Sequence, residues 1–139
     1  FMRALDSYLV QANASLRESA EISESGREAL ERIFANVVTM STGKGVRRGC
    51  FSVNSTIELG PHDPDVQDRL RRNTREKEKT FASIIRKGIA DGSLRRDIVP
   101  DLAGAYLTTV LNGLQVSGKL GLTKRQANQT VEIAMRAFV

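Results

Sequence analysis

The sequence predicts an all-α protein, a single bundle of about six helices spanning residues 1–139. Three observations lead to this prediction. Residues suited to helix caps recur along the chain, apolar residues follow them at helical spacing, and one stretch alone has the alternation typical of a strand. A chain of 139 residues is long enough for one domain with a hydrophobic core. The elements can be assigned in chain order.

A capping signal at Ser25 separates the first two predicted helices. Before it, apolar residues at helical spacing indicate a helix: Leu5, Tyr8, Leu9, Ala12 and Leu16. Residues 25–28, Ser-Gly-Arg-Glu, are a capping-box pattern, in which the Ser hydroxyl caps the helix start. The apolar stripe that follows consists of Leu30, Ile33, Phe34, Val37 and Val38. This second helix is expected to end near Gly43 and Gly45.

Residues 49–59, GCFSVNSTIEL, alternate apolar and polar side chains as a β-strand does. A strand needs a partner for its backbone N–H and C=O groups, and the sequence offers no second convincing strand. We therefore predict a short buried helix that ends at Gly60 and Pro61, against the local β-propensity. One face of this helix would carry Cys50, Val53 and Ile57.

Asp63 and Pro64 mark the start of a long helix, with an Asp N-cap and Pro at the first helical position. No breaker follows until Gly88, and Gly92 is the expected stop. The inner stripe is apolar towards both ends: Val66, Leu70, Phe81, Ile84 and Ile85. Its middle is polar: Asn73, Thr74 and Lys77. Either this part of the helix leaves the core, or these side chains face an internal cavity.

Two further helices are predicted from Pro100 and from Thr123. The first runs to about Gly118 or Gly121, and residues 123–126, Thr-Lys-Arg-Gln, form a capping-box pattern at the start of the second. Both carry more apolar surface than one core needs, because a surface helix requires an apolar stripe only a little over ~100° wide. We interpret the surplus as an interface between two copies of the chain. The residues expected at or beside this interface are Gly113, Leu114, Ser117, Gly118, Val131, Met135 and Phe138.

The composition is that of a soluble, globular, cytoplasmic chain. Hydrophobic residues make up 40% and charged residues 27%, and no apolar run approaches the ~18 residues of a membrane span. One Cys excludes an internal disulfide and suits a reducing compartment. The net charge is +5, but the basic residues within 69–79 are interleaved with acids, as on a solvated helix face. Aromatic residues make up only 5%, so the sequence shows no nucleic-acid-binding surface of its own.

Catalytic and metal sites are not indicated. His62, the single His, lies in an expected turn, and a zinc site needs more ligands than one His and one Cys. Cys50 is interpreted as a small buried hydrophobic residue, with redox sensing as the alternative. Residues 41–49, STGKGVRRG, contain Gly and Lys without the spacing of a phosphate-binding loop. We therefore expect no enzyme activity, cofactor or metal.

The order and spacing of these features resemble one branch of the TetR/AcrR family of transcriptional repressors. The similar segments lie within residues 27–139: RRGCFSVNSTIELGPHDPDV and FASIIRKGIADGSLRRDIVPDLAGAYLTTVLNGLQVSGKLGLTKRQ. The resemblance implies the C-terminal regulatory domain, which binds a small-molecule effector and forms a homodimer through its last two long helices. Members of the family also carry an N-terminal helix-turn-helix domain that binds operator DNA. We do not find that domain in this sequence and expect it to be absent from the chain.

The resemblance and the predicted helix faces together place a ligand pocket among the helices. The residues expected to line it are Phe34, Val38, Phe51, Asn54, Asn73, Lys77, Phe81, Tyr106, Leu107 and Leu111. Lys77 departs from the family pattern, which has a more apolar residue there. Effector binding is expected to release DNA. The alternatives are a helical interaction module without a ligand and an enzyme that modifies a small molecule.

Overall fold

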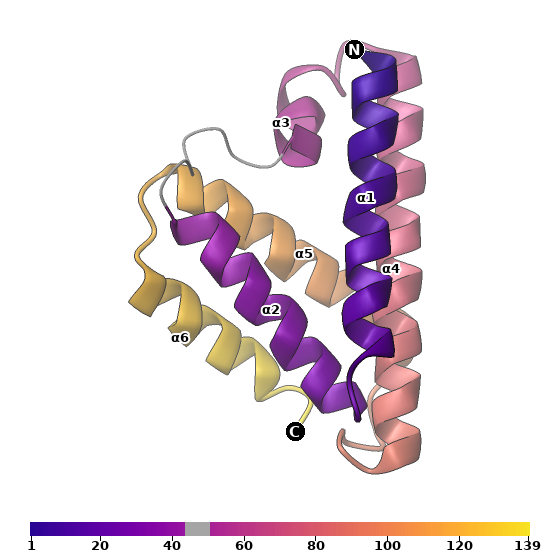
Figure 1. Ribbon diagram of the computed structural model, residues 1–139, viewed down its shortest axis with the longest axis vertical. Coiled ribbons are helices and arrows are strands. Elements are labelled where there is room, and N and C mark those ends of the chain that lie inside the picture. The colour runs from indigo at the N-terminus through magenta and orange to yellow at the C-terminus, as the bar shows by residue number, and fades with distance from the viewer. Residues whose placement is uncertain (44–50) are drawn as a thin grey trace.

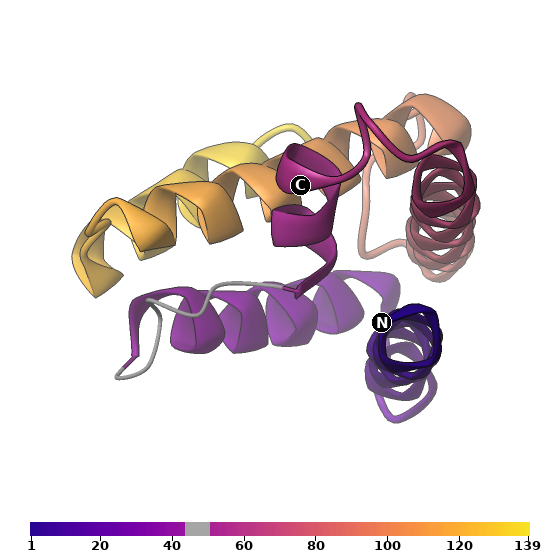
Figure 2. The same ribbon diagram turned by 90° about the horizontal axis from the view of Figure 1, so that it is seen from above.

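The computed structural model describes residues 1–43 and 51–139, which form six helices and no β-strand. These are α1 (Met2–Glu21), α2 (Gly26–Thr42), α3 (Phe51–Glu58), α4 (Pro64–Asp91), α5 (Pro100–Lys119) and α6 (Lys124–Met135). In Figure 1, α1 and α4 stand side by side, and α2, α5 and α6 run at an angle to them. Figure 2 shows α2 in one layer and α5 and α6 in the other. The predicted all-α fold is confirmed.

Hydrogen bonds at the helix starts follow the predicted caps. The Oγ of Ser25 accepts from the backbone N–H of Glu28 over 3.0 Å. The Glu28 carboxylate accepts from the backbone N–H of Glu24 rather than that of Ser25, and this bond holds the pKa of Glu28 below its ordinary value. The capping box of Thr123 and Gln126 is complete in both directions. Side chains within a few residues of each helix start therefore define where α2 and α6 begin.

The long helix α4 begins and ends where its capping residues predict. One carboxylate oxygen of Asp63 accepts from the N–H groups of Asp65 and Val66 over 3.0 and 3.2 Å. Gly92 follows the last turn with φ +79°, the left-handed conformation that glycine adopts without a steric penalty. These two caps therefore delimit one uninterrupted helix of 28 residues.

The stretch with strand-like alternation is helical from Phe51 onwards, as predicted. Its buried residues are Ser52, Val53 and Ser55. Val53 and Ile57 lie one turn apart on the same side of α3, as predicted, but the expected burial is wrong for Ile57, which is 58% exposed. At about 100° per residue, Val53 and Ser55 lie within about 100° of Ser52, whereas Ile57 lies about 140° from it and so points further from the buried side. Cys50, the third residue predicted on that face, lies outside the described residues.

The core is organised around α2, which packs against α1, α4, α5 and α6. Phe34 of α2 and Phe81 of α4 lie at its centre, with their rings stacked and the ring centroids 5.9 Å apart. A smaller cluster joins the first halves of α1 and α4 and consists of Leu5, Leu9, Val66 and Leu70. The second half of α1 instead carries Leu16 into the main core. Among the described residues, no helix combines the length and the apolar character that crossing a membrane requires.

Three residues predicted at an interface between chains lie inside the chain's own core. Leu114 and Phe138 are 3% and 4% exposed. A Cβ on Gly118 would lie 2.3 Å from the carbonyl oxygen of Ser41, so α5 and the end of α2 approach closely there. The prediction is corrected for these residues because α2 passes across α5 and α6 and covers their inner faces. Gly113 is exposed, and Ser117, Val131 and Met135 are half-buried.

Candidate functional site

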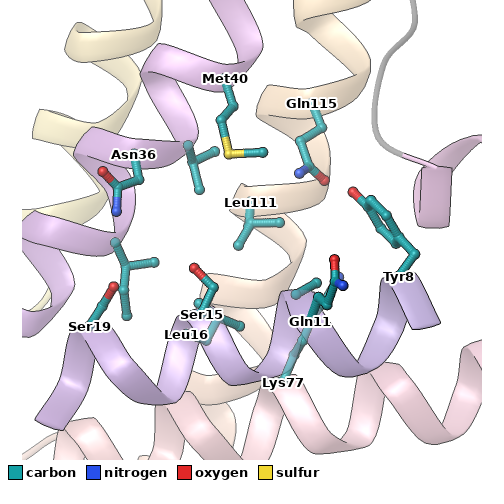
Figure 3. A pocket seen from close by; sticks show the side chains of 13 residues that line it. Tyr8, Gln11, Ser15, Leu16, Ser19, Asn36, Met40, Lys77, Leu111 and Gln115 are labelled. Atoms are coloured by element: carbon teal, nitrogen blue, oxygen red, sulfur yellow. The ribbon is translucent and has the colours of Figure 1, made fainter. Parts of the chain in front are cut away.

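A cavity of about 250 Å³ lies between α1 on one side and α2 and α5 on the other (Figure 3). Its described lining residues are Tyr8, Gln11, Ala12, Ser15, Leu16, Ser19, Ile33, Asn36, Val37, Met40, Lys77, Leu111 and Gln115. The volume is slightly below the range of roughly 300–1,000 Å³ typical of ligand pockets. The cavity therefore suits a small molecule.

The lining has a buried floor and an exposed mouth. The floor consists of Leu16, Ile33, Val37, Lys77 and Leu111. The mouth lies between α1 and α2 and is flanked by Gln11, Ser15, Asn36 and Met40, all of them exposed. A ligand entering here would contact polar groups first and apolar side chains deeper inside.

The wall formed by α1 is mainly polar and was not predicted from the sequence. Tyr8, Gln11, Ser15 and Ser19 recur three or four residues apart, so they lie along one side of the helix. This polar row lies next to the apolar stripe that packs against α4 and the core. The spacing of the row is the sequence signal that could have indicated a wall facing a cavity.

Two of the three polar residues in the middle of α4 are buried, and the third, Thr74, is half-buried. Asn73 and Lys77 are 5% and 6% exposed, which excludes the interpretation that this part of α4 leaves the core. Lys77 lies at the cavity floor and reaches up from α4 past α1 in Figure 3. The Oδ1 of Asn73 accepts from the side-chain amide of Asn13 over 2.9 Å, so this residue joins α4 to α1 instead of lining the cavity.

Gln115 of α5 closes the cavity near Tyr8. In Figure 3 the Gln115 amide and the phenol of Tyr8 point toward one another from opposite walls. The Oε1 of Gln115 is buried, and no described residue donates a hydrogen bond to it. A buried acceptor without a donor is unfavourable, so a ligand or water in the cavity that donates to this oxygen would be stabilised.

Most of the other predicted pocket residues do not line this cavity. Four of them are packed in the core: Phe34, Val38, Phe81 and Leu107. Their prediction as pocket walls is corrected, because the faces of α2, α4 and α5 that carry them close directly on one another. Leu111 and Lys77 do line the cavity, although their role in binding a ligand stays a prediction.

Two predicted residues, Asn54 and Tyr106, lie elsewhere. Asn54 is half-buried on α3, and its Oδ1 accepts from Nζ of Lys119 over 2.7 Å, which connects α3 to the end of α5. Tyr106 is 40% exposed, and its ring lies 5.9 Å from that of Phe138. The side chain of Phe51 lies outside the described part of the chain.

Within residues 1–43 and 51–139, no group of three or more His, Cys, Asp or Glu side chains could hold a metal ion. The cavity is lined by hydroxyl, amide and apolar groups with one ammonium group. Such groups bind and orient a small molecule by hydrogen bonds and packing.

Comparisons with known proteins identify the family. Residues 26–138 match the family described as "Tetracyclin repressor-like, C-terminal domain". The chain is 33% identical over 81 residues to the uncharacterized HTH-type transcriptional regulator YezE of Bacillus subtilis (strain 168). It is 27% identical over 110 residues to the HTH-type transcriptional repressor DhaR of Mycobacterium sp. (strain GP1). These alignments cover 58% and 79% of the chain but only 42% and 54% of the two relatives, so the chain spans about half their length.

Solved structures of a TetR family regulator have the same fold. A cysteine mutant of CifR in complex with 26-bp operator DNA superposes with a TM-score of 0.86 at 29% identity. A second CifR mutant structure, with operator DNA and with the apo protein, gives 0.85 at 31% identity. The matches cover 100% and 99% of this chain and 72% of CifR. The chain thus belongs to the TetR family of transcriptional regulators and carries its tetracyclin-repressor-like C-terminal domain.

Proposed function

We propose that the chain is the effector-sensing and dimerising domain of a cytoplasmic transcriptional repressor, in which a small molecule bound in the cavity weakens operator binding. The observation that carries this proposal is that α1 forms one whole wall of the cavity. The relatives are HTH-type regulators that extend well beyond the aligned region, and CifR was solved with operator DNA. We infer that a DNA-binding domain acts through α1 in the full-length protein.

The contacts of α1 differ between its two sides. Towards α4 it is held by an ion pair between Asp6 and Arg69, by the bond between Asn13 and Asn73, and by a small apolar cluster. Towards α2 and α5 it borders the cavity. Occupation of the cavity therefore bears directly on the side of α1 that faces α2 and α5. A ligand shifts the regulator towards a state that releases DNA only if it binds that state more tightly.

Dimerisation is supported by an exposed apolar row on α5. Leu102 and Tyr106 on α5 are 70% and 40% exposed, and Leu120, directly after its last residue, is 85% exposed. Gly113 lies between them on the same side of the helix. Large exposed side chains arranged in one row mark a surface for another protein. A second copy of the chain, placed with α5 and α6 against their symmetry mates, would cover this row.

The cavity is tested by a thermal-shift screen of small apolar and amphipathic molecules, because a ligand that binds only the native state raises the melting temperature. Ala12 lines the cavity, whereas Ala14 on the same helix is exposed. Compounds that stabilise the wild-type chain are expected to lose their effect on Ala12→Leu, which fills the cavity, and to keep it on Ala14→Leu. The absence of any stabilising compound, or equal shifts in both variants, would contradict the proposal.

A further inference from the structure

We propose that the effector is a small amphipathic molecule with a single carboxylate, which binds the ammonium group of Lys77. The inference rests on the proposed function, since it concerns the ligand of the same cavity. Among the described residues that line the cavity, Lys77 has the only charged side chain, and no Asp or Glu is present. The one charged side chain of this lining is therefore a cation, and it lies at the buried floor.

The position of Lys77 is unusual for a lysine. Exposed lysines bind anions weakly, because water and salt screen the charge. Lys77 is 6% exposed, so an anion in contact with it would be largely removed from water, where charge-assisted hydrogen bonds are stronger. An ammonium group carries three N–H donors and can bind a ligand oxygen in addition to a contact within the protein.

The apolar residues of the floor determine what kind of body the carboxylate ligand can have. Leu16, Ile33, Val37 and Leu111 are buried apolar side chains around the same cavity, and they suit an aliphatic or aromatic body. A monovalent carboxylate matches the single cationic side chain of the described lining with one negative charge. A phosphate group with about two negative charges would leave an excess charge in a mainly apolar space, which is strongly unfavourable. The cavity volume of about 250 Å³ limits the body to a short chain or a single ring.

The test uses two matched probes, 3-phenylpropionate and its neutral amide, 3-phenylpropanamide. Their dissociation constants for the 139-residue chain are measured by NMR titration at neutral pH. The carboxylate is expected to bind about tenfold or more tightly than the amide. The neutral variant Lys77→Met should abolish this preference. The control Lys79→Met, which removes a lysine whose side chain is 75% exposed on the same helix, should retain it.

The outcomes separate this inference from the proposed function. Equal affinity of both probes for the wild type, or an unchanged preference in Lys77→Met, overturns the carboxylate assignment. If both probes bind equally and both lose affinity in Ala12→Leu, the cavity is still a ligand site and the proposed function stands. If neither probe binds, the assignment is overturned while the thermal-shift screen decides the proposed function. Circular dichroism checks that each variant folds. If Lys77→Met does not fold, Lys77→Gln replaces it as the neutral variant.

Discussion

The side-chain amide of Asn13 on α1 donates a hydrogen bond to the Oδ1 of Asn73 on α4 over 2.9 Å. Asn73 is 5% exposed, and the Oδ1 of Asn13 is buried without a donor among the described residues. The pair joins the cavity-bordering helix α1 to the long helix α4, one turn from Lys77. Its energetic contribution depends on both partners, because a lost hydrogen bond is most unfavourable when one polar group stays buried alone.

Replacing Asn73 by Leu is therefore expected to lower the free energy of unfolding by about 1–3 kcal/mol, since the Asn13 amide would lose its acceptor. The double variant Asn13→Leu/Asn73→Leu should recover most of this loss, because no buried polar group is left unpaired. Urea unfolding of the two single variants and the double variant gives the coupling energy. Additive effects of the two substitutions would show that the bond does not couple α1 to α4.

Asp91, at the end of α4, is expected to make stability depend on pH. Its carboxylate accepts from Ser93 and from the backbone N–H of Gly26 at the start of α2, and these bonds lower its pKa, the Ser93 hydroxyl having the largest effect. A lowered pKa stabilises the folded chain above the ordinary value of about 3.9, and the contribution is lost as the pH falls through the lowered pKa. Asp91→Asn should therefore lower the melting temperature at pH 7.

The difference in melting temperature between wild type and Asp91→Asn should shrink as the pH falls from about 5 towards about 2. Asp68→Asn is the control, because Asp68 forms an exposed pair with Arg72 within α4, a kind of pair that contributes little. Thermal unfolding followed by circular dichroism gives the melting temperatures of the wild type and of both variants at each pH. A difference that stays constant over this range would argue against a role for the Asp91 charge in joining α2 to α4.

Gly104 sets the distance between α4 and α5. A Cβ at this position would lie 2.4 Å from the carbonyl oxygen of Glu78, which is backbone and cannot rotate away. Gly104→Ala is therefore expected to reduce the free energy of unfolding by about 1–3 kcal/mol through overpacking. Gly113→Ala, on the same helix with no atom of the chain within 4 Å of the added Cβ, should not reduce it when both variants are measured at a concentration where the chain is monomeric. Equal effects of the two substitutions on the free energy of unfolding would mean that α5 can move away from α4 without a loss of stability.

Local features of the sequence predicted the helices well, because a cap acts within a few residues of its own position. Ser25, Asp63 and Thr123 all cap the helices that the sequence assigns to them. Even the strand-like stretch was predictable as helix α3, since an isolated strand has no partner for its backbone.

The rotation of each helix about its axis was harder to predict, since it depends on which neighbours the helix meets. Phe138 and Leu114 belong to broad apolar faces that could equally cover a core or a second chain, and the packing of α2 decides for the core. The cavity wall on α1 was missed for the same reason. Ser15 and Gln11 have the composition of a solvated face, and only the position of α2 shows that they border a cavity.

Gly113 offers a test of the dimer that leaves the single chain undisturbed. It is exposed on α5, between Tyr106 and Leu120, and the space around its Cα is open within the chain. Gln at this position favours a helix and finds room in an isolated chain. In a dimer built on the exposed row of α5, the same side chain would separate two closely packed helices, and the two-fold symmetry would place it there twice.

Analytical ultracentrifugation at micromolar concentration is expected to show a dimeric wild-type chain and a largely monomeric Gly113→Gln variant. Overpacking of a contact typically costs about 1–3 kcal/mol at each site, and the symmetry doubles this loss in the dimer. Ala35→Gln, at an exposed position on α2, is the matched control and should remain dimeric. The melting temperature of the variant, measured where the wild type is monomeric, should not fall. A monomeric wild type, or a folded Gly113→Gln variant that stays dimeric, would exclude this row of α5 as the interface.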